Sequence, residues 1–128
     1  MTNLRYHNST ISETGDAYSH AVIDGNYAFC AGQFAPDAKH REVKLGDIAD
    51  ETRATMEMLQ DVLRGLGLDF HDVVRANVYL ADPELFDGMN AVYRSFFTPG
   101  KLPARTTVIT RLLYNCLVEI DCIARLRR

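Results

Sequence analysis

An arginine, Arg105, stands two residues after Pro103 at the start of a predicted β-strand. The guanidinium group carries five N–H donors in one plane and can hold a carboxylate through two parallel hydrogen bonds. Fixed at the beginning of a rigid strand, Arg105 would be suited to bind the carboxylate of a small molecule. The alternative is an ordinary solvated arginine beside a strand, because most arginines in proteins are exposed.

Glu119 is the second candidate, and it lies in the last predicted strand, residues 117–124. Alternate residues of that strand form a polar row with Glu119 and an apolar row, which consists of Val118, Ile120, Cys122 and Ala124. If the last two strands form a hairpin, Arg105 and Glu119 lie on adjacent strands and can pair on one face of the sheet. The alternative for Glu119 is a strand carboxylate that pairs with Arg105, Arg75 or solvent.

Two amphipathic helices and six strands must position these side chains. The strands are predicted at residues 4–7, 18–23, 27–31, 73–80, 105–111 and 117–124. An Asp-Gly turn at residues 24–25 joins the second and third strands as a hairpin. Asp47 caps a helix that runs to Leu66, and Asp82 caps a second helix that ends before residues 98–100.

The helices and strands together predict a two-layer α+β fold with a mixed sheet. Both helices have one apolar stripe and need one apolar sheet face to cover, so both are expected on the same face. The other face then carries polar residues among apolar ones, namely Arg75, Asn77, Glu119 and Asp121. Such a face is either wet or buried against another copy of the chain.

The length and charge restrict the class of protein. The 128 residues fit a single domain, residues 1–128. The net charge of −3 argues against a nucleic-acid partner, which requires a basic surface. The first twenty residues have no signal-peptide layout, and no apolar run approaches a membrane span. A cytoplasmic protein with no membrane partner is therefore expected.

The cysteines and histidines indicate no metal site. Cys30, Cys116 and Cys122 are odd in number and widely spaced, as expected for reduced thiols. Cys122 is expected in the core, and Cys30 is either a reactive thiol or a structural residue at the end of a strand. The four histidines show no ligand spacing, so no metal is expected. Gly32 follows a strand and suits either a close approach or a simple turn.

Six segments, taken in order, give the chain a likeness to a known family. They are residues 15–22, 29–33, 72–80, 89–97, 103–105 and 118–124, and they include Pro103-Ala104-Arg105. Over essentially its whole length the chain resembles the RidA/YjgF family of reactive-intermediate imine deaminases. The resemblance implies a chorismate-mutase-like α+β fold that assembles as a homotrimer, with active sites in the clefts between subunits.

The resemblance also implies roles for particular residues. Arg105 corresponds to the family arginine that holds the substrate carboxylate, and Glu119 corresponds to the acidic residue that orients the attacking water. Tyr18 corresponds to the aromatic residue that lines the pocket. The strand-end backbone beside Gly32 contributes to the cleft, and Asn90 corresponds to an asparagine of the second helix.

Three residues depart from the family pattern. Ala31 stands where many members have serine, Thr107 where many have cysteine, and Asp121 where glutamate is common. Ala31 and Thr107 are expected to line the substrate site. Because both changes remove a polar contact, the range of substrates is expected to differ from that of other members.

The implied reaction is hydrolysis of 2-imino and 2-enamino acids, of the 2-aminoacrylate type, to 2-keto acids and ammonia. This is the activity of a 2-iminobutanoate/2-iminopropanoate deaminase, a hydrolase that acts on C=N bonds. Arg105 would aim the imine carbon, and Glu119 would accept a proton from water and help return one to the leaving nitrogen. No cofactor is expected.

Three other functions remain open. One is a pathway-specific deaminase that acts on a larger enamine, such as an aminomuconate. A second is a trimer that binds a carboxylate metabolite without turnover. A third is a ribonuclease, an activity ascribed to some relatives, which the acidic net charge disfavours.

Overall fold

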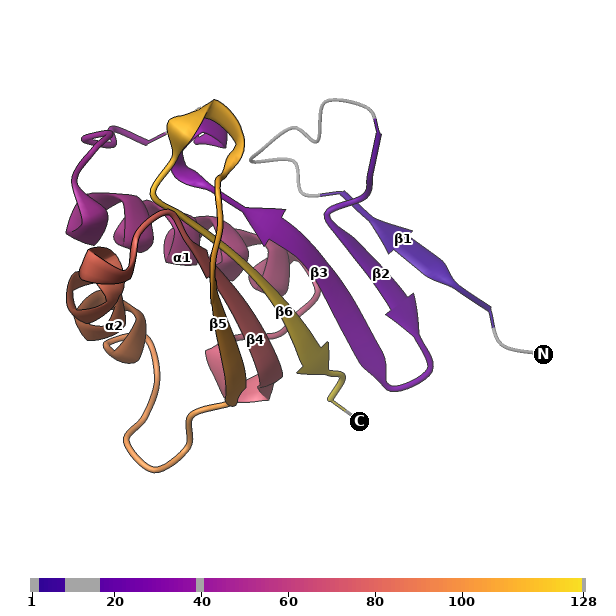
Figure 1. The fold of residues 1–128 in the computed structure, drawn as a ribbon. Helices are drawn as coiled ribbons and strands as arrows, with labels where there is room; N and C mark the ends of the chain where they lie inside the picture. The colour runs from indigo at the N-terminus through magenta and orange to yellow at the C-terminus, as the bar shows by residue number, and fades with distance from the viewer. Residues whose placement is uncertain (1–2, 9–16, 39–40, 128) are drawn as a thin grey trace.

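The computed structural model describes residues 3–8, 17–38 and 41–127 and shows helices packed against one sheet (Figure 1). The strands are β1 (Arg5–His7), β2 (Ala21–Asp24), β3 (Tyr27–Gln33), β4 (Val73–Leu80), β5 (Ala104–Ile109) and β6 (Val118–Arg125). The α-helices are α1 (Ile48–Gly65) and α2 (Phe86–Arg94). Short 3-10 turns are η1 (Ala35–Asp37), η2 (Phe70–Asp72), η3 (Pro83–Leu85) and η4 (Leu113–Asn115). The predicted order of strands and helices is confirmed.

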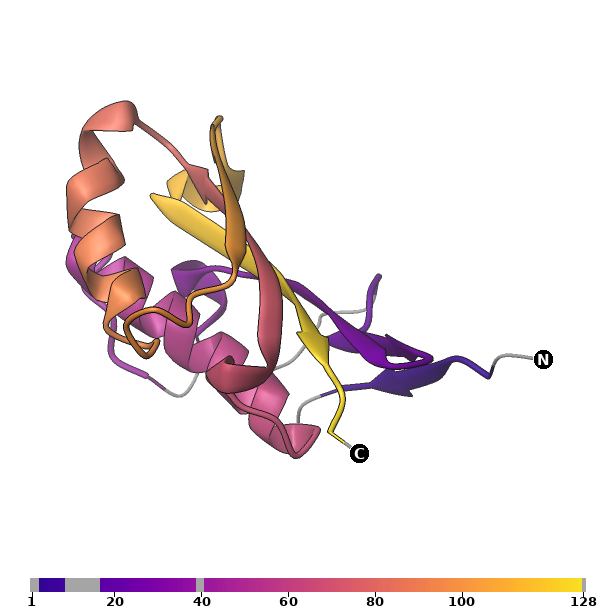
Figure 2. The same cartoon turned by 90° about the horizontal axis from the view of Figure 1, so that it is seen from below.

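Within the described residues the sheet has six strands in the order β1-β2-β3-β6-β4-β5. Neighbouring strands are antiparallel except β4 and β5, which are parallel. A parallel pair needs a crossover between its strands, and α2 supplies it. Both helices lie on one side of the sheet, as the view from below shows (Figure 2). The predicted α+β fold with a mixed sheet and two helices on one face is therefore confirmed.

The last two strands do not form a hairpin, and this expectation is wrong. Strand β6 lies between β3 and β4, so that β4 separates it from β5. The apolar row of β6 is completely buried, and a central position lets both edges of this strand form hydrogen bonds. Strand β5 instead follows the α2 crossover to the edge, where most of its side chains stay exposed.

The two helices cover the sheet through the predicted apolar stripes. Asp47 caps α1 by accepting a hydrogen bond from the backbone N–H of Asp50 at 3.1 Å. The buried stripe of α1 includes Met56, Leu59, Val62 and Leu63, and that of α2 consists of Met89 and Tyr93. The second helix is shorter than predicted, because Asp82 caps the 3-10 turn η3 before α2 begins. No helix within the described residues combines the length and apolar character needed to cross a membrane.

The three cysteines are free and buried, in agreement with thiols that serve packing. Cys30 lies directly opposite Cys122 on the neighbouring strand, on the side of the sheet that faces the helices. Burial raises the pKa of Cys116 to about 11, so its thiol stays protonated at neutral pH.

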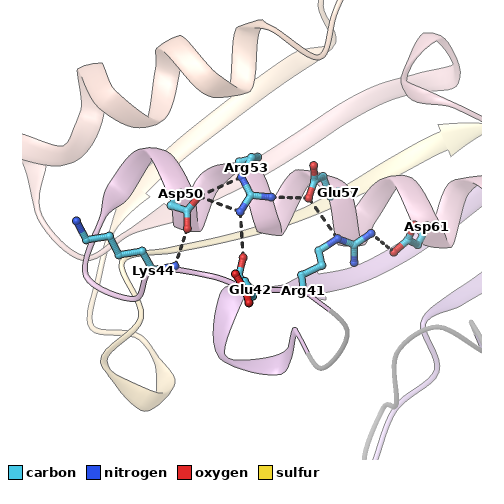
Figure 3. Close-up of polar contacts among 7 residues, drawn as sticks. All are labelled: Arg41, Glu42, Lys44, Asp50, Arg53, Glu57 and Asp61. Atoms are coloured by element: carbon cyan, nitrogen blue, oxygen red, sulfur yellow. Dashed lines mark hydrogen bonds and ion pairs between the residues drawn. The ribbon is translucent and has the colours of Figure 1, made fainter.

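Charged side chains tie the segment before α1 to the outer face of that helix (Figure 3). Arg53 donates hydrogen bonds to Asp50 at 2.8 Å and to Glu57 at 2.6 Å. Arg41 donates to Asp61 at 2.6 Å and forms an ion pair with Glu57 at 3.2 Å. Each pair is partly exposed and contributes little by itself, but the network orients the residues that lead into α1.

A buried carboxylate joins two loops beneath the helix layer. Glu51 is 1% exposed, and its two oxygens accept hydrogen bonds from the backbone N–H of Gly46 at 2.7 Å and of Leu117 at 2.9 Å. We expect Glu51→Ala to lower the free energy of unfolding by about 3 kcal/mol, because two backbone donors lose a charged acceptor. Urea denaturation followed by circular dichroism measures this change. Glu84→Ala, at an exposed position, is the matched control, and equal midpoints for both variants would contradict the expectation.

Candidate active site

Arg105 and Glu119 lie on opposite faces of the sheet, which corrects the expectation that they pair on one face. Arg105 is in register with Ala76 on β4, and Glu119 is in register with Tyr79 on the same strand. These partners are three positions apart on β4, and an odd separation places side chains on opposite faces. Arg105 therefore shares the side of the helices, and Glu119 lies on the face that the helices leave uncovered.

Helix α2 builds the surroundings of Arg105. The guanidinium Nη1 donates a hydrogen bond to Oδ1 of Asn90 at 2.7 Å. Its central carbon lies 4.8 Å from the ring centroid of Tyr93 and 5.6 Å from that of Phe86. Cations attract the faces of aromatic rings at such distances, so these contacts fix the plane of the guanidinium. We call Arg105, Asn90, Tyr93 and Phe86 the arginine half-site.

A pocket of about 240 Å³ opens beside the arginine half-site. Its lining consists of Asn90, Tyr93, Arg94, Leu102, Pro103 and Arg105. Asn90 takes one guanidinium N–H, and the planar group carries five. The other N–H donors of Arg105 make no hydrogen bond to the residues that the structure describes, so they can hold a carboxylate. Asn90 thus orients the arginine and also lines the pocket.

Gly32 makes room for the side chain of Glu119. A Cβ atom at position 32 would collide with Oε2 of Glu119, so that a side chain there would displace the carboxylate. Gly32 was predicted to allow close approach of another backbone or a ligand, and the group that approaches in this chain is instead the side-chain carboxylate of the neighbouring strand. The backbone N–H of Ala31 donates to the carbonyl of His20 at 2.8 Å, which draws the segment before β2 alongside the end of β3.

Burial and neighbouring charges change the acidity of the groups around Glu119. Burial, Asp121 and Asp37 raise the pKa of Glu119. Burial, Asp37, Glu119 and Tyr114 raise the pKa of Tyr18, so its phenol stays protonated. A carboxylate with a raised pKa is a stronger base, which suits it to accept a proton from water. We call Glu119, Gly32, Tyr18, Asp37 and Tyr114 the glutamate half-site.

The raised pKa of Glu119 predicts that a reaction with this carboxylate as its base is sensitive to acid. If the ionised carboxylate is the base, kcat/KM falls as the pH drops through this pKa, at a higher pH than for an ordinary glutamate. Asp121→Asn removes one of the negative charges that raise it, so we expect the acid limb to move to lower pH. A pH–rate profile measures the shift, and Asp24→Asn, at an exposed position, is the control. A limb that stays in place in Asp121→Asn would contradict this assignment.

Asp121 is itself held in place on the uncovered face. Its carboxylate accepts hydrogen bonds from Nδ2 of Asn77 at 2.8 Å and from the hydroxyl of Tyr79 at 3.1 Å. The predicted polar row on this face is therefore present. Asp121 acts on Glu119 through its charge.

The structure divides the predicted site residues into two groups. Tyr18, Ala31 and Gly32 belong with Glu119, and Asn90 and Thr107 belong with Arg105. Tyr18 lies just before β2 and not within it, because that strand begins at Ala21. Thr107 is two residues after Arg105 on the same side of β5. Each group is complete in itself, but one chain does not bring the two together.

Sequence reasoning included Tyr18 but missed other aromatic residues at the two half-sites. Tyr93 was expected only as a core residue of α2, and it is buried as expected, but it also carries Arg105 on its ring. Phe34 and Tyr114 stack with their ring centroids 6.0 Å apart. Neither residue was predicted from the sequence to belong to the site. The one feature of the sequence that could have indicated an aromatic residue here was Tyr114, in the turn before the strand of Glu119.

Comparison with known proteins places the chain in a family. The family model described as Endoribonuclease L-PSP matches residues 10–126. A RutC family protein of Pyrococcus horikoshii is 42% identical over 84% of this chain and 85% of its own length. A protein of Rattus norvegicus named 2-iminobutanoate/2-iminopropanoate deaminase is 33% identical over 84% of this chain and 79% of its own.

Solved structures show the same fold. The YjgF gene product of E. coli superposes with a TM-score of 0.84 at 28% identity, covering 96% of this chain and 99% of that one. Yeast Mmf1 superposes with a TM-score of 0.86 at 26% identity, covering 98% of this chain and all of the other. The chain therefore belongs to the endoribonuclease L-PSP family, which is the RidA/YjgF family that its sequence resembles.

Proposed function

We propose that the protein is a hydrolytic deaminase that converts 2-imino and 2-enamino acids to 2-keto acids and ammonia. The observation that carries this proposal is that one half-site can bind a carboxylate and the other can act as a base. One holds a guanidinium rigidly with donors to spare, and the other holds a half-buried carboxylate with a raised pKa. The name of the rat relative supports this reaction.

We further propose that the working site is formed between copies of the chain in a homotrimer. Two groups on opposite faces of one sheet cannot act on the same small molecule within one chain. The uncovered face also exposes apolar side chains on two strands, namely Tyr27 and Phe29 on β3 and Val108 on β5. Exposed apolar patches of this kind are typical of association surfaces. Arg105 of one copy would then face Glu119 of the next, across the edge strand β5.

The proposed reaction needs only water. An enamine first takes a proton at carbon and becomes the iminium, which is the nitrogen-protonated form of the imine. Arg105 holds the carboxylate and thereby fixes the position of the imine carbon. Water attacks that carbon while Glu119 accepts its proton, and the resulting carbinolamine has one new C–O bond. Glu119 returns the proton to nitrogen, and the C–N bond breaks as the hydroxyl oxygen forms the carbonyl. The departing ammonia takes the hydroxyl proton and leaves the 2-keto acid as ammonium. One water is consumed, and nothing is oxidised or reduced.

A coupled assay tests the proposal. D-amino acid oxidase generates the imine in place, and the rate of keto acid formation is followed with and without the protein. Positioned acid–base groups supply about a hundredfold to ten-thousandfold, so a clear acceleration is expected. Tight binding of keto acids without acceleration of any imine would favour the carboxylate-binding trimer instead. Activity confined to a large enamine would favour the pathway-specific deaminase.

A further inference from the structure

We propose that Tyr114, stacked on Phe34 and close to Tyr18, forms an aromatic wall that selects imino acids with large apolar or aromatic side chains. This inference rests on the proposed deaminase function and names the substrate class for the same site. Tyr114 lies in the turn η4, between β5 and β6, at the end of the sheet where β3 also ends (Figure 1).

The backbone holds Tyr114 in an unusual conformation. Tyr114 has φ 55° and Asn115 has φ 52°, two consecutive left-handed residues without a glycine. Such conformations are strained for residues with a side chain and persist where the surroundings enforce them. Here the backbone N–H of Cys116 donates to the carbonyl of Leu113 at 3.2 Å and closes the turn. The closed turn directs the side chain of Tyr114 to Phe34.

The ring of Tyr114 is held on one face and open on the other. Its centroid lies 6.0 Å from that of Phe34, and the two rings are inclined by only 17°. Phe34 is 8% exposed and gives a fixed support, whereas Tyr114 is 75% exposed. An aromatic ring fixed on a buried partner, with its far face in water, is suited to stack against a third apolar group.

The wall stands beside the carboxylate that the reaction uses. Phe34 is two residues beyond Gly32, against which Glu119 packs. Tyr18 is 43% exposed and adds a second ring, and its pKa is raised by burial, Asp37, Glu119 and Tyr114. Both the position of Phe34 and the electrostatic contacts of Tyr18 therefore place the wall at the glutamate half-site.

The three substituents of the imine carbon place the side chain of an imino acid next to this wall. Arg105 takes the carboxylate and Glu119 lies at the imine carbon, so the third substituent of that carbon is the side chain. A methyl group covers little of an exposed ring, whereas a benzyl or isobutyl group removes apolar surface on both partners from water. Imines derived from phenylalanine or leucine are thus the expected substrates, ahead of those derived from alanine.

The test compares imines made by D-amino acid oxidase from D-phenylalanine and from D-alanine. We expect Tyr114→Ser to lower kcat/KM for the phenylalanine-derived imine about tenfold to a hundredfold, and to lower it clearly less for the alanine-derived imine. Tyr114→Phe keeps the ring and should retain the preference. Leu45→Ser removes an exposed apolar side chain from the loop before α1 and is the control.

Three results would overturn the inference. They are an unmodified protein that prefers the alanine-derived imine, an equal loss for both imines in Tyr114→Ser, and dissociation of the trimer in that variant by native mass spectrometry. The last result would make Tyr114 an interface residue. Failure of the proposed function is distinct, because the unmodified protein would then accelerate neither imine.

Discussion

Arg105→Ala is expected to lower kcat/KM for every 2-imino acid by about a hundredfold to ten-thousandfold. The guanidinium is the group proposed to fix the carboxylate, and without it the imine carbon is no longer aimed at the attacking water. Arg105→Lys keeps the charge but loses the planar pair of donors and the stacking on Tyr93, so an intermediate loss is expected. The coupled oxidase assay measures both variants.

The matched control for Arg105→Ala is Arg64→Ala. Arg64 is an exposed arginine in the last turn of α1, and its removal should leave the rate unchanged. The variants must also be compared for unfolding midpoint and mass, because Arg105 packs against α2. A folded Arg105→Ala protein with undiminished activity would refute the role proposed for this arginine.

Mixing two inactive variants is expected to restore activity. Arg105→Ala keeps Glu119, and Glu119→Gln keeps Arg105. A site between copies is therefore intact where Arg105 of a Glu119→Gln copy faces Glu119 of an Arg105→Ala copy. In every cyclic trimer that contains both variants, one of the three sites is intact, so activity should recover to about a third of the unmodified level. The measurement uses two differently tagged chains, expressed together and purified through both tags.

This experiment addresses the placement of the two residues on opposite faces of the sheet. If one chain contained a complete site, each variant would inactivate its own chain, and mixing would restore nothing. Mixing Arg105→Ala with the double variant Arg105→Ala/Glu119→Gln is the control, because no arginine is then available at any site. Recovery in the control would point to contamination by unmodified protein.

Local patterns in the sequence identified each strand and helix and, in the last strand, the face that each residue occupies. The alternation in residues 117–124 correctly put Glu119 and Asp121 opposite the buried row, because side chains alternate along a strand whatever its neighbours are. The capping residue Asp47 and the apolar stripe of α1 were predicted for the same reason, since both depend on residues a few positions apart. The family likeness added the roles of Arg105 and Glu119, which remain predictions.

The order of the strands was decided by tertiary packing alone. The residues of β5 and β6 do not indicate which strand each will pair with. Pairing depends on how α2 crosses the sheet and on which strand buries the most apolar surface in a central position. The stacking of Tyr114 on Phe34, some eighty residues earlier in the chain, is decided in the same way. The sequence and its family likeness therefore predicted which groups carry the chemistry. The tertiary structure determined that Arg105 and Glu119 lie on opposite faces. The reason is that β4 lies between their strands, and its residues in register with them, Ala76 and Tyr79, are three positions apart.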